Sequence, residues 1–262
     1  MSDFIIQKDT DVLNLESIII KELLDKNKYI YTYTELSLSS LNLLESPKPN
    51  LYPIGTIEFV TYYLNKVYGI KQMNPIEIPE YLRTEEFLKR DYMIVNAEEI
   101  PENGTYFVKD ISQLKVFETV IYLDKDIKKD LLSEHKSDMD FSLNLDKTHL
   151  YQVSEVYDIQ AEYRVYVIDG NIEAICNYNG DCTVLPDIGL LKKAVNLINF
   201  NEKWLKSYTL DIMVGPRGTA IIEVHNFVSV GLYGTLWGNN LIYAYKDGID
   251  YVINDNKELK LK

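Results

Sequence analysis

The stretch SYTLDIMVGPRGTAIIEVHN, residues 207–226, decides the fold because two apolar runs flank a turn sequence. Residues 216–218 predict a three-residue loop in which Gly218 supplies the left-handed position. In that geometry Gly215 pairs with Thr219, and the whole stretch forms a β-hairpin.

Counting outward from this turn sets Asp211 directly opposite Glu223. Because side chains alternate along a strand, His225 shares their face, whereas Asn226 falls on the opposite face if the strand extends that far. A four-residue loop would instead set Asp211 opposite Ile222 and separate the two carboxylates. Three further residues share the face of Asp211 in the first count: Thr209, Met213 and Ile221.

Two directly opposed carboxylates repel each other unless a cation or a proton lies between them. Mg²⁺ prefers oxygen ligands and usually bridges one or two carboxylates to substrate phosphates. The hairpin therefore predicts a metal site at Asp211 and Glu223. The alternative is a pair of solvated carboxylates on an outer sheet face.

Residues 162–178 predict a second hairpin that turns at Asp169-Gly170, a pair favoured in two-residue type I′ turns. Pairing Ile168 with Asn171 creates one apolar face and one polar face. The expected pairs are Val165 with Ala174 and Val167 with Ile172 on the apolar face, and Glu162 with Asn177, Arg164 with Ile175 and Tyr166 with Glu173 on the other.

Apolar residues at helical spacing predict three helices, and two short strands are expected outside the hairpins. The helices are residues 11–26, 55–68 and 187–205, and the strands are residues 106–109 and 116–122. Gly69 supplies a stop for the second helix. Residues 123–147 are charge-dense with weak periodicity, so we expect a mobile surface segment there.

Composition limits the functional classes. With 262 residues, 46% hydrophobic and 26% charged, the chain is typical of a globular protein of one large or two small domains. Its net charge of -13 and the lack of a basic stripe argue against a general nucleic-acid-binding surface. Two cysteines, Cys176 and Cys182, are too few for a disulfide scaffold or a zinc site. An acidic start and no apolar run of about 18 residues predict a cytoplasmic protein without signal peptide or membrane span.

Three segments, in this order and spacing, resemble the ATP-grasp superfamily. They are YFVKDISQLKVF (106–117), VSEVYDIQAEYRVYVIDG (153–170) and the hairpin with Asp211 and Glu223. The superfamily pattern is a lysine at a strand end, a hinge with glutamate, an E-x-R strand, and late Asp and E-x-N metal ligands.

The sequence resembles in particular the bacterial and phage clade named for one arginine and two lysines. These residues would be Arg90 in FLKRDY, Lys109 in YFVKD and Lys115 in LKVF. The clade's E-V-N-D ending and G-x-Y loop look like EVHN and GLYG here, and PIGTIEFV is similar to an upstream proline–glycine element.

This resemblance implies an α+β ATP-grasp fold, in which two α+β subdomains clamp ATP. An N-terminal α/β region would precede it at residues 1–92. The ATP-grasp domain would span residues 93–262, with a smaller lysine-bearing lobe at 93–152 and a metal-binding lobe at 153–262.

The resemblance also implies roles for the basic residues. Lys109 would bind the α- and β-phosphates, and Lys115 would supply a second phosphate or adenine-side contact. Arg164 would stabilise charge on the transferred phosphoryl group or an acyl-phosphate, a task that suits a permanently charged, bidentate guanidinium. Arg90 would belong to the ATP-binding set, or is an ordinary arginine at a helix end.

The adenosine part of ATP would contact the second of the three segments. Glu155 and Val156 would form the hinge that meets the adenine edge, largely through backbone groups. Glu162 would accept hydrogen bonds from the ribose hydroxyls, or is a surface partner for a lysine.

Two positions depart from the clade pattern. Lys109 is followed by Asp110 where the clade has proline, which places an acid near the phosphate-binding cation. The asparagine of E-x-N is replaced by His225, with Asn226 next to it. The parity of the strand favours His225 as the third metal ligand, whereas a one-residue bulge would bring in Asn226. Imidazole suits Mn²⁺ better than Mg²⁺.

The function implied is an ATP-dependent carboxylate–amine ligase that uses ATP and Mg²⁺, with Mn²⁺ as an alternative. Its partners would be small-molecule or peptide carboxylates and amines. Two rivals are a phosphotransferase on the same nucleotide site, and a non-catalytic nucleotide-binding or interaction protein, which the departure at His225 favours.

Overall fold

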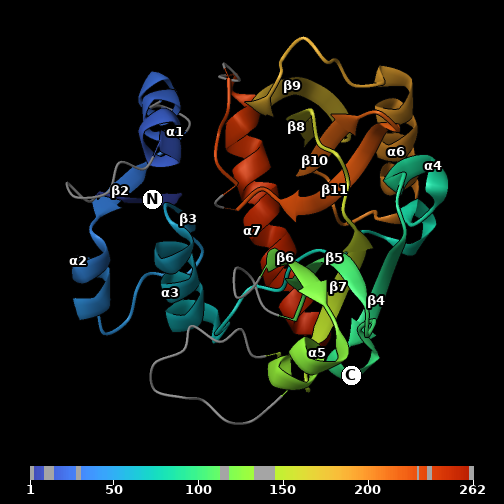
Figure 1. The fold of residues 1–262 in the computed structure, drawn as a ribbon. Helices are drawn as coiled ribbons and strands as arrows, with labels where there is room; N and C mark the ends of the chain where they lie inside the picture. Colours follow the sequence, from blue (N-terminus) through green and yellow to red (C-terminus); the bar gives the residue numbers. More distant parts are fainter. Residues whose placement is uncertain are drawn as a thin grey trace.

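A computed structural model of the chain describes residues 3–8, 15–27, 31–112, 118–132, 145–228, 230–234 and 238–259. Three sheets follow one another along the sequence. Figure 1 shows the C-terminal helix α7 (Asn240–Leu259) running between the first sheet and the third. Parallel and antiparallel sheets combine with helices, which confirms the predicted α+β class.

The first sheet is parallel, with strand order β2-β1-β3. Its strands are β1 (Phe4–Gln7), β2 (Tyr33–Leu36) and β3 (Tyr52–Ile54), and its helices are α1 (Leu15–Lys26), α2 (Leu38–Leu43) and α3 (Ile57–Tyr68). Gly69 ends α3 in the left-handed conformation, at φ 69°, as expected from the sequence. This alternation matches the expected α/β character of the N-terminal region, while the domain limits at residues 92 and 152 stay predictions.

The second sheet is antiparallel, with order β4-β7-β5-β6. Its strands are β4 (Tyr92–Asn96), β5 (Gly104–Asp110), β6 (Glu118–Leu123) and β7 (Leu150–Glu155). The short helices around it are η1 (Glu80–Leu82), α4 (Glu85–Leu88), η2 (Ala97–Glu99) and α5 (Lys125–Leu131). Helix α5 lies in the segment expected to be irregular, and residues 133–144 of that segment lie outside the described residues.

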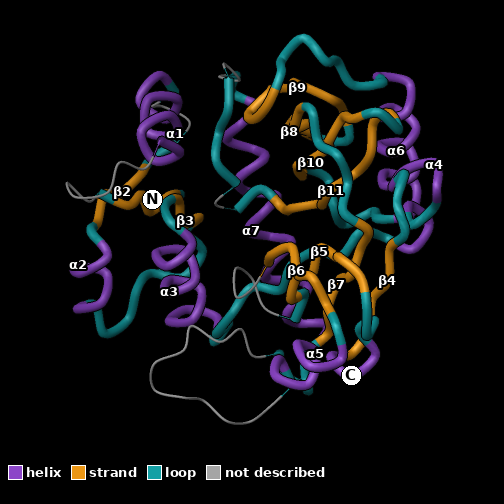
Figure 2. The backbone as a smooth tube through the Cα atoms, viewed as in Figure 1, coloured by secondary structure: helices purple, strands orange, loops and turns teal. Residues whose placement is uncertain are grey.

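The third sheet has order β11-β10-β8-β9 and bears the two predicted hairpins. Its strands are β8 (Ala161–Ile168), β9 (Asn171–Gly180), β10 (Tyr208–Gly215) and β11 (Gly218–Asn226). Helix α6 (Ile188–Asn201) packs on the face that bears Leu210 and Ile212. Helix α7 packs against the other face, and α1 packs against α7 (Figure 2). That other face bears Tyr166 together with Arg164 and Asp211.

The β10–β11 hairpin reaches the predicted pairing by a different route. Gly215 pairs with Gly218, so the turn has two residues, and the predicted three-residue loop was wrong. A β-bulge between the 212–221 and 211–223 pairs restores the count, and Asp211 does lie opposite Glu223. The bulge turns Ile221 into the core beside Ile212, so its predicted place on the face of Asp211 was also wrong.

The first hairpin turns at Asp169-Gly170 with φ angles of 48° and 75°, as the I′ turn requires, and Ile168 pairs with Asn171. Beyond the 167–172 pair, two bulges shift the register, because β9 is longer than the strand it follows. The expected partners further out were therefore wrong: Arg164 pairs with Cys176, Val165 with Ile175, Tyr166 with Ala174 and Glu162 with Asn179.

In the described part of the chain, no helix combines the length and apolarity that a bilayer crossing requires.

Candidate functional site

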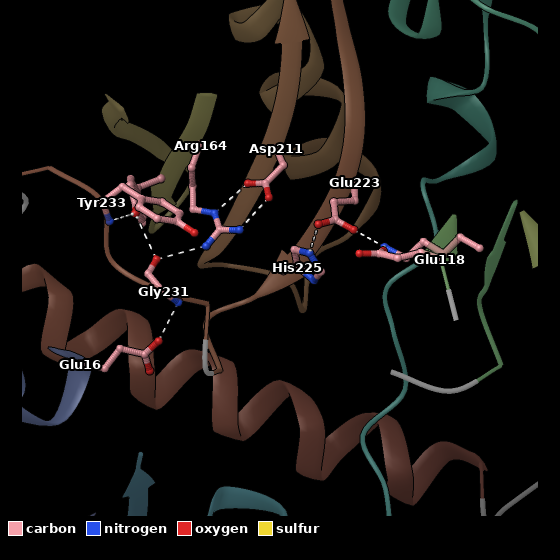
Figure 3. Close-up of polar contacts among 10 residues, drawn as sticks. Glu16, Glu118, Arg164, Asp211, Glu223, His225, Gly231 and Tyr233 are labelled. Atoms are coloured by element: carbon pink, nitrogen blue, oxygen red, sulfur yellow. Dashed lines mark hydrogen bonds and ion pairs between the residues drawn. The ribbon is translucent and has the colours of Figure 1, made fainter. Parts of the chain in front are cut away.

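The hairpin places Asp211, Glu223 and His225 within reach of one ion. Ligand atoms of these three residues lie within 4.8 Å of one another. His225 Nε2 is 2.6 Å from Glu223 Oε1, and Figure 3 shows both side chains on the same side of β11. The bulge precedes Glu223 and leaves the two residues on one face. The three side chains predicted as metal ligands are therefore brought together.

Arg164 lies on β8 directly beside Asp211 and grips its carboxylate with two bonds. Nε donates to Oδ1 at 2.7 Å, and Nη2 donates to Oδ2 at 2.6 Å. Burial lowers the pKa of Arg164, but the bonds to Asp211 outweigh this effect and raise the pKa above its ordinary value. Of the five N–H groups on the guanidinium, bonds among the described residues use three, because Nη1 also donates to the Gly231 carbonyl. Two remain for a ligand.

Lys109 joins the second sheet to the third. Its Nζ, at the end of β5, is ion-paired with Glu223 Oε2 on β11 and lies 3.5 Å from Glu118 Oε2. Burial lowers the pKa of Lys109, yet these two carboxylates outweigh burial and raise it. Conversely, burial raises the pKa of the Glu223 carboxyl, but His225 and Lys109 hold it well below its usual range. Lys109 thus stays charged and Glu223 ionised.

The opposed carboxylates therefore have counter-charges from the protein itself. Arg164 balances Asp211, and Lys109 balances Glu223. The donor set still fits a hard divalent cation, because each carboxylate oxygen has a further lone pair and both carboxylates line one face. His225 is the softer member of the set and suits Mn²⁺ better than Mg²⁺.

A cavity of about 390 Å³ opens in front of these side chains. Lys109, Arg164, Glu223 and His225 line it on one side. Residues 73–78 line another side, where Ile76 forms a bridge to Val224 and so covers the outer edge of β11. A segment before the second sheet thus completes a pocket whose charged wall comes from the second and third sheets.

The predicted adenosine contacts lie outside this cavity. Glu155 ends β7, and its Oε2 accepts from Arg217 Nη1 at 2.8 Å, which links the hinge to the β10–β11 turn. Val156 follows it and is exposed. Glu162 Oε1 accepts from Asn179 Nδ2 at 3.3 Å. Their roles stay predictions, and Lys115 lies outside the described residues.

Arg90 is buried, with 7% of its surface exposed, and it supports the bulge. Its Nη1 donates to the carbonyl oxygens of Leu88 and Ile221, each at 2.9 Å. Ile221 is the residue next to the bulge, where the ladder is broken and a carbonyl needs another donor. In this structure Arg90 thus stabilises the strand that presents Glu223, and a contact with ATP remains a prediction.

Sequence reasoning gave no role to several residues at the site. Tyr178 and Tyr233 stack at 5.0 Å, and the Arg164 guanidinium lies 5.1 Å from the Tyr233 ring. Asp110, the departure after Lys109, is buried and binds His149 Nδ1 at 2.6 Å. Tyr233 lies in the GLYG motif and was signalled by it, whereas the partners of Tyr178 and His149 depend on tertiary folding.

The chain is similar to known proteins both in sequence profile and in fold. Residues 87–239 match the profile of an ATP-grasp domain, that of family 2 in the clade named for one arginine and two lysines. No curated protein sequence matches the chain.

Several solved structures are similar in fold. The D-alanine–D-alanine ligase of Bacillus anthracis complexed with ATP is 17% identical with a TM-score of 0.44, covering 98% of this chain and 96% of that one. The RimK domain ATP-grasp protein of Sphaerobacter thermophilus is 11% identical at a TM-score of 0.49, covering 96% and 98%. The macrocyclase MdnC of Microcystis aeruginosa, bound with precursor peptide MdnA, is 12% identical at a TM-score of 0.48, covering 97% and 100%. At these values nothing about substrate or partner follows from the likeness.

Proposed function

This chain belongs to the ATP-grasp domains, in family 2 of the arginine-and-two-lysines clade, and from that premise we propose that it is an ATP-dependent carboxylate–amine ligase. It would join a small-molecule or peptide carboxylate to an amine through an acyl-phosphate, with release of ADP and phosphate. The family assignment confirms the ATP-grasp resemblance that the sequence motifs indicated. The reaction, the metal and the site residues are the proposal.

One observation carries the proposal. Glu223, His225, Lys109 and Arg164, from strands of two sheets, line one cavity. The carboxylate of Asp211 lies directly behind them, with ligand atoms of Asp211, Glu223 and His225 within 4.8 Å of one another. Such a set can bind phosphate oxygens and a divalent cation while leaving room for an acceptor.

The proposed reaction has two steps. A substrate carboxylate oxygen attacks the γ-phosphorus of ATP, and the bond to the β-phosphate oxygen breaks, which gives the acyl-phosphate and ADP. The amine nitrogen then attacks the acyl carbon, phosphate leaves, and the nitrogen loses a proton. Lys109 would hold the phosphates, and the two remaining N–H groups of Arg164 would bind the oxygens on which charge develops.

The cation would be held by Asp211, Glu223 and His225. When bound, a divalent ion there would neutralise charge on the phosphate oxygens during transfer. His225 makes Mn²⁺ a competent substitute for Mg²⁺.

The experiment is a screen for ADP release. The protein is incubated with Mg-ATP and, in turn, single amino acids and short peptides, and the products are identified by mass spectrometry. Hydroxylamine is added in parallel, because it intercepts an acyl-phosphate as a stable hydroxamate. An amide with hydroxamate trapping is expected. A stable phosphorylated product without hydroxamate would establish the phosphotransferase reading instead.

Variants test the metal assignment. Asp211→Asn and Glu223→Gln should each lower ADP release by at least about a hundredfold, because each removes an anionic ligand of the cation that would neutralise the transferred phosphoryl group. Glu173→Gln is the matched control, since this glutamate lies exposed on β9 of the same sheet. Unchanged turnover in either of the first two variants would contradict the metal site.

A further inference from the structure

Helix α1 contributes one buried carboxylate to the neighbourhood of the site. Glu16 has 5% of its surface exposed and lies far outside residues 87–239, which match the family. Its Oε1 accepts from the backbone N–H of Gly231 at 2.6 Å (Figure 3).

Gly231 passes this contact on to Arg164. The Gly231 carbonyl accepts from Arg164 Nη1 at 3.1 Å and from the hydroxyl of Tyr166 at 3.2 Å. The Tyr166 hydroxyl in turn accepts from the backbone N–H of Tyr233 at 2.7 Å. Gly231 has φ 66°, a conformation that costs glycine little. In this conformation its N–H faces Glu16, and its carbonyl faces Arg164 and Tyr166.

The consequence for Arg164 is a fixed orientation. The bidentate bond to Asp211 places one edge of the guanidinium, and the Gly231 carbonyl holds a third N–H group. The Tyr233 ring lies 5.1 Å away and comes from the same short segment, residues 230–234. A shift of that segment would therefore release both the third bond and the ring contact.

We propose that Glu16 is a positioning residue that acts through Gly231 to orient the guanidinium of Arg164. Its effect on turnover rests on the proposed function, whereas its effect on Arg164 does not. The N-terminal region thereby becomes part of the active assembly, and catalysis depends on α1 packing in place.

Three variants separate positioning from packing. Glu16→Met keeps the volume of the side chain and removes the acceptor, and Glu16→Gln keeps both the volume and an acceptor oxygen. Ile20→Val is the control, because Ile20 is fully buried on the same helix and contributes only to the core. Melting temperatures of all three show how far each change destabilises the fold.

The first readout is the Arg164 Nη1–H resonance in ¹⁵N-labelled protein, because Nη1 is the atom that the Gly231 carbonyl holds. The chain has only four arginines, and the loss of one signal in Arg164→Lys assigns it. We expect exchange of this N–H with water to become about tenfold faster in Glu16→Met, and to stay within about twofold of the original rate in Glu16→Gln and Ile20→Val. No change in Glu16→Met, or an equal change in Ile20→Val, overturns the proposal.

The second readout is the split between kcat and KM for ADP release. Misplacing a catalytic group lowers kcat, so Glu16→Met should lose about tenfold or more in kcat with KM for ATP within about twofold, and Glu16→Gln should recover most of it. A change in KM for ATP without a change in kcat contradicts positioning.

If the unmodified protein releases no ADP with any carboxylate, the proposed function fails and the resonance alone decides the role of Glu16. If Glu16→Met does not fold, the unmodified protein still gives an answer: Gly231 N–H must be protected from exchange, and an unprotected amide overturns the proposal.

Discussion

The buried ion pair of Arg164 and Asp211 should contribute strongly to stability, and removing one partner should reveal it. Only 10% of the Arg164 side chain and 3% of the Asp211 side chain are exposed. Arg164→Met leaves the Asp211 carboxylate buried without its two bonds. Breaking a buried pair in this way costs about 3–5 kcal/mol. Asp211→Asn keeps the shape and one acceptor, so it should cost about 2–3 kcal/mol.

The double variant distinguishes a true pair from two separate contacts. Arg164→Met with Asp211→Asn removes both charges, so neither is left uncompensated. We expect the double variant to be more stable than the sum of the single losses predicts, by about 2 kcal/mol.

The measurement is urea unfolding at neutral pH, followed by circular dichroism. The slope with denaturant must stay constant across the series, since a changed slope means a changed transition. Lys193→Met is the matched control, because Lys193 pairs with Glu86 at the surface with 54% and 49% of the two side chains exposed. Such a pair contributes below about 1 kcal/mol. A loss in Arg164→Met no larger than in Lys193→Met, or strictly additive losses in the double variant, would refute the reasoning.

Three further predictions concern Glu223, Lys109 and Arg90. The folded protein holds the pKa of Glu223 below the unfolded value of about 4.3, so the ionised Glu223 stabilises the fold above that pH. This contribution is lost as the pH falls below the unfolded value. The urea midpoint of Glu223→Gln should therefore fall less on acidification than that of the unmodified protein. Lys109→Met should weaken Mg-ATP binding about tenfold to a hundredfold. It should strengthen the binding of Mn²⁺ alone, because Glu223 is no longer ion-paired with Lys109. Calorimetry that shows weaker binding of both Mg-ATP and Mn²⁺ would contradict this prediction. Arg90→Met should cost about 2–4 kcal/mol in urea unfolding, since it leaves the carbonyls of Leu88 and Ile221 without a donor, and a loss below about 1 kcal/mol would exclude the proposed support of the bulge.

The pairing of Asp211 with Glu223 was predicted from the sequence, but two errors compensated each other. The turn is one residue shorter than predicted, and Ile222 is the extra residue of the β-bulge, without a partner in the β10–β11 register. Ile221 and Ile222 are the same residue type, so alternation cannot say which of them faces the core. The bulge is supported by Arg90, which lies 131 residues away in the sequence. Local pattern thus determined the strands, and tertiary contacts determined the register.

Other contacts at the site had no sequence signal, although some of the residues that make them did. Glu16 and Gly231 are 215 residues apart, and their bond forms only when α1 packs beside α7 and the segment that follows β11. Lys109 and Glu223 come from different sheets, and their pairing depends on how these sheets meet. Helix α7 is a different case, because Leu241, Tyr245, Ile249 and Val252 are buried at helical spacing, so periodicity alone could have predicted it.

The charges in the cavity wall explain why nucleotide and metal should bind together. Asp211 and Glu223 are balanced by Arg164 and Lys109, so the wall carries no formal excess from these four groups. A divalent cation alone must compete with Lys109 for Glu223, and a triphosphate alone meets two carboxylates. If Lys109 turns to the phosphates as proposed, Glu223 would lose its counter-charge, and a divalent cation could replace it. Each ligand thus completes the site for the other, and by reciprocity each should raise the affinity of the other by the same factor. Because the Lys109–Glu223 ion pair joins β5 to β11, this exchange would also change the contact between the second sheet and the third.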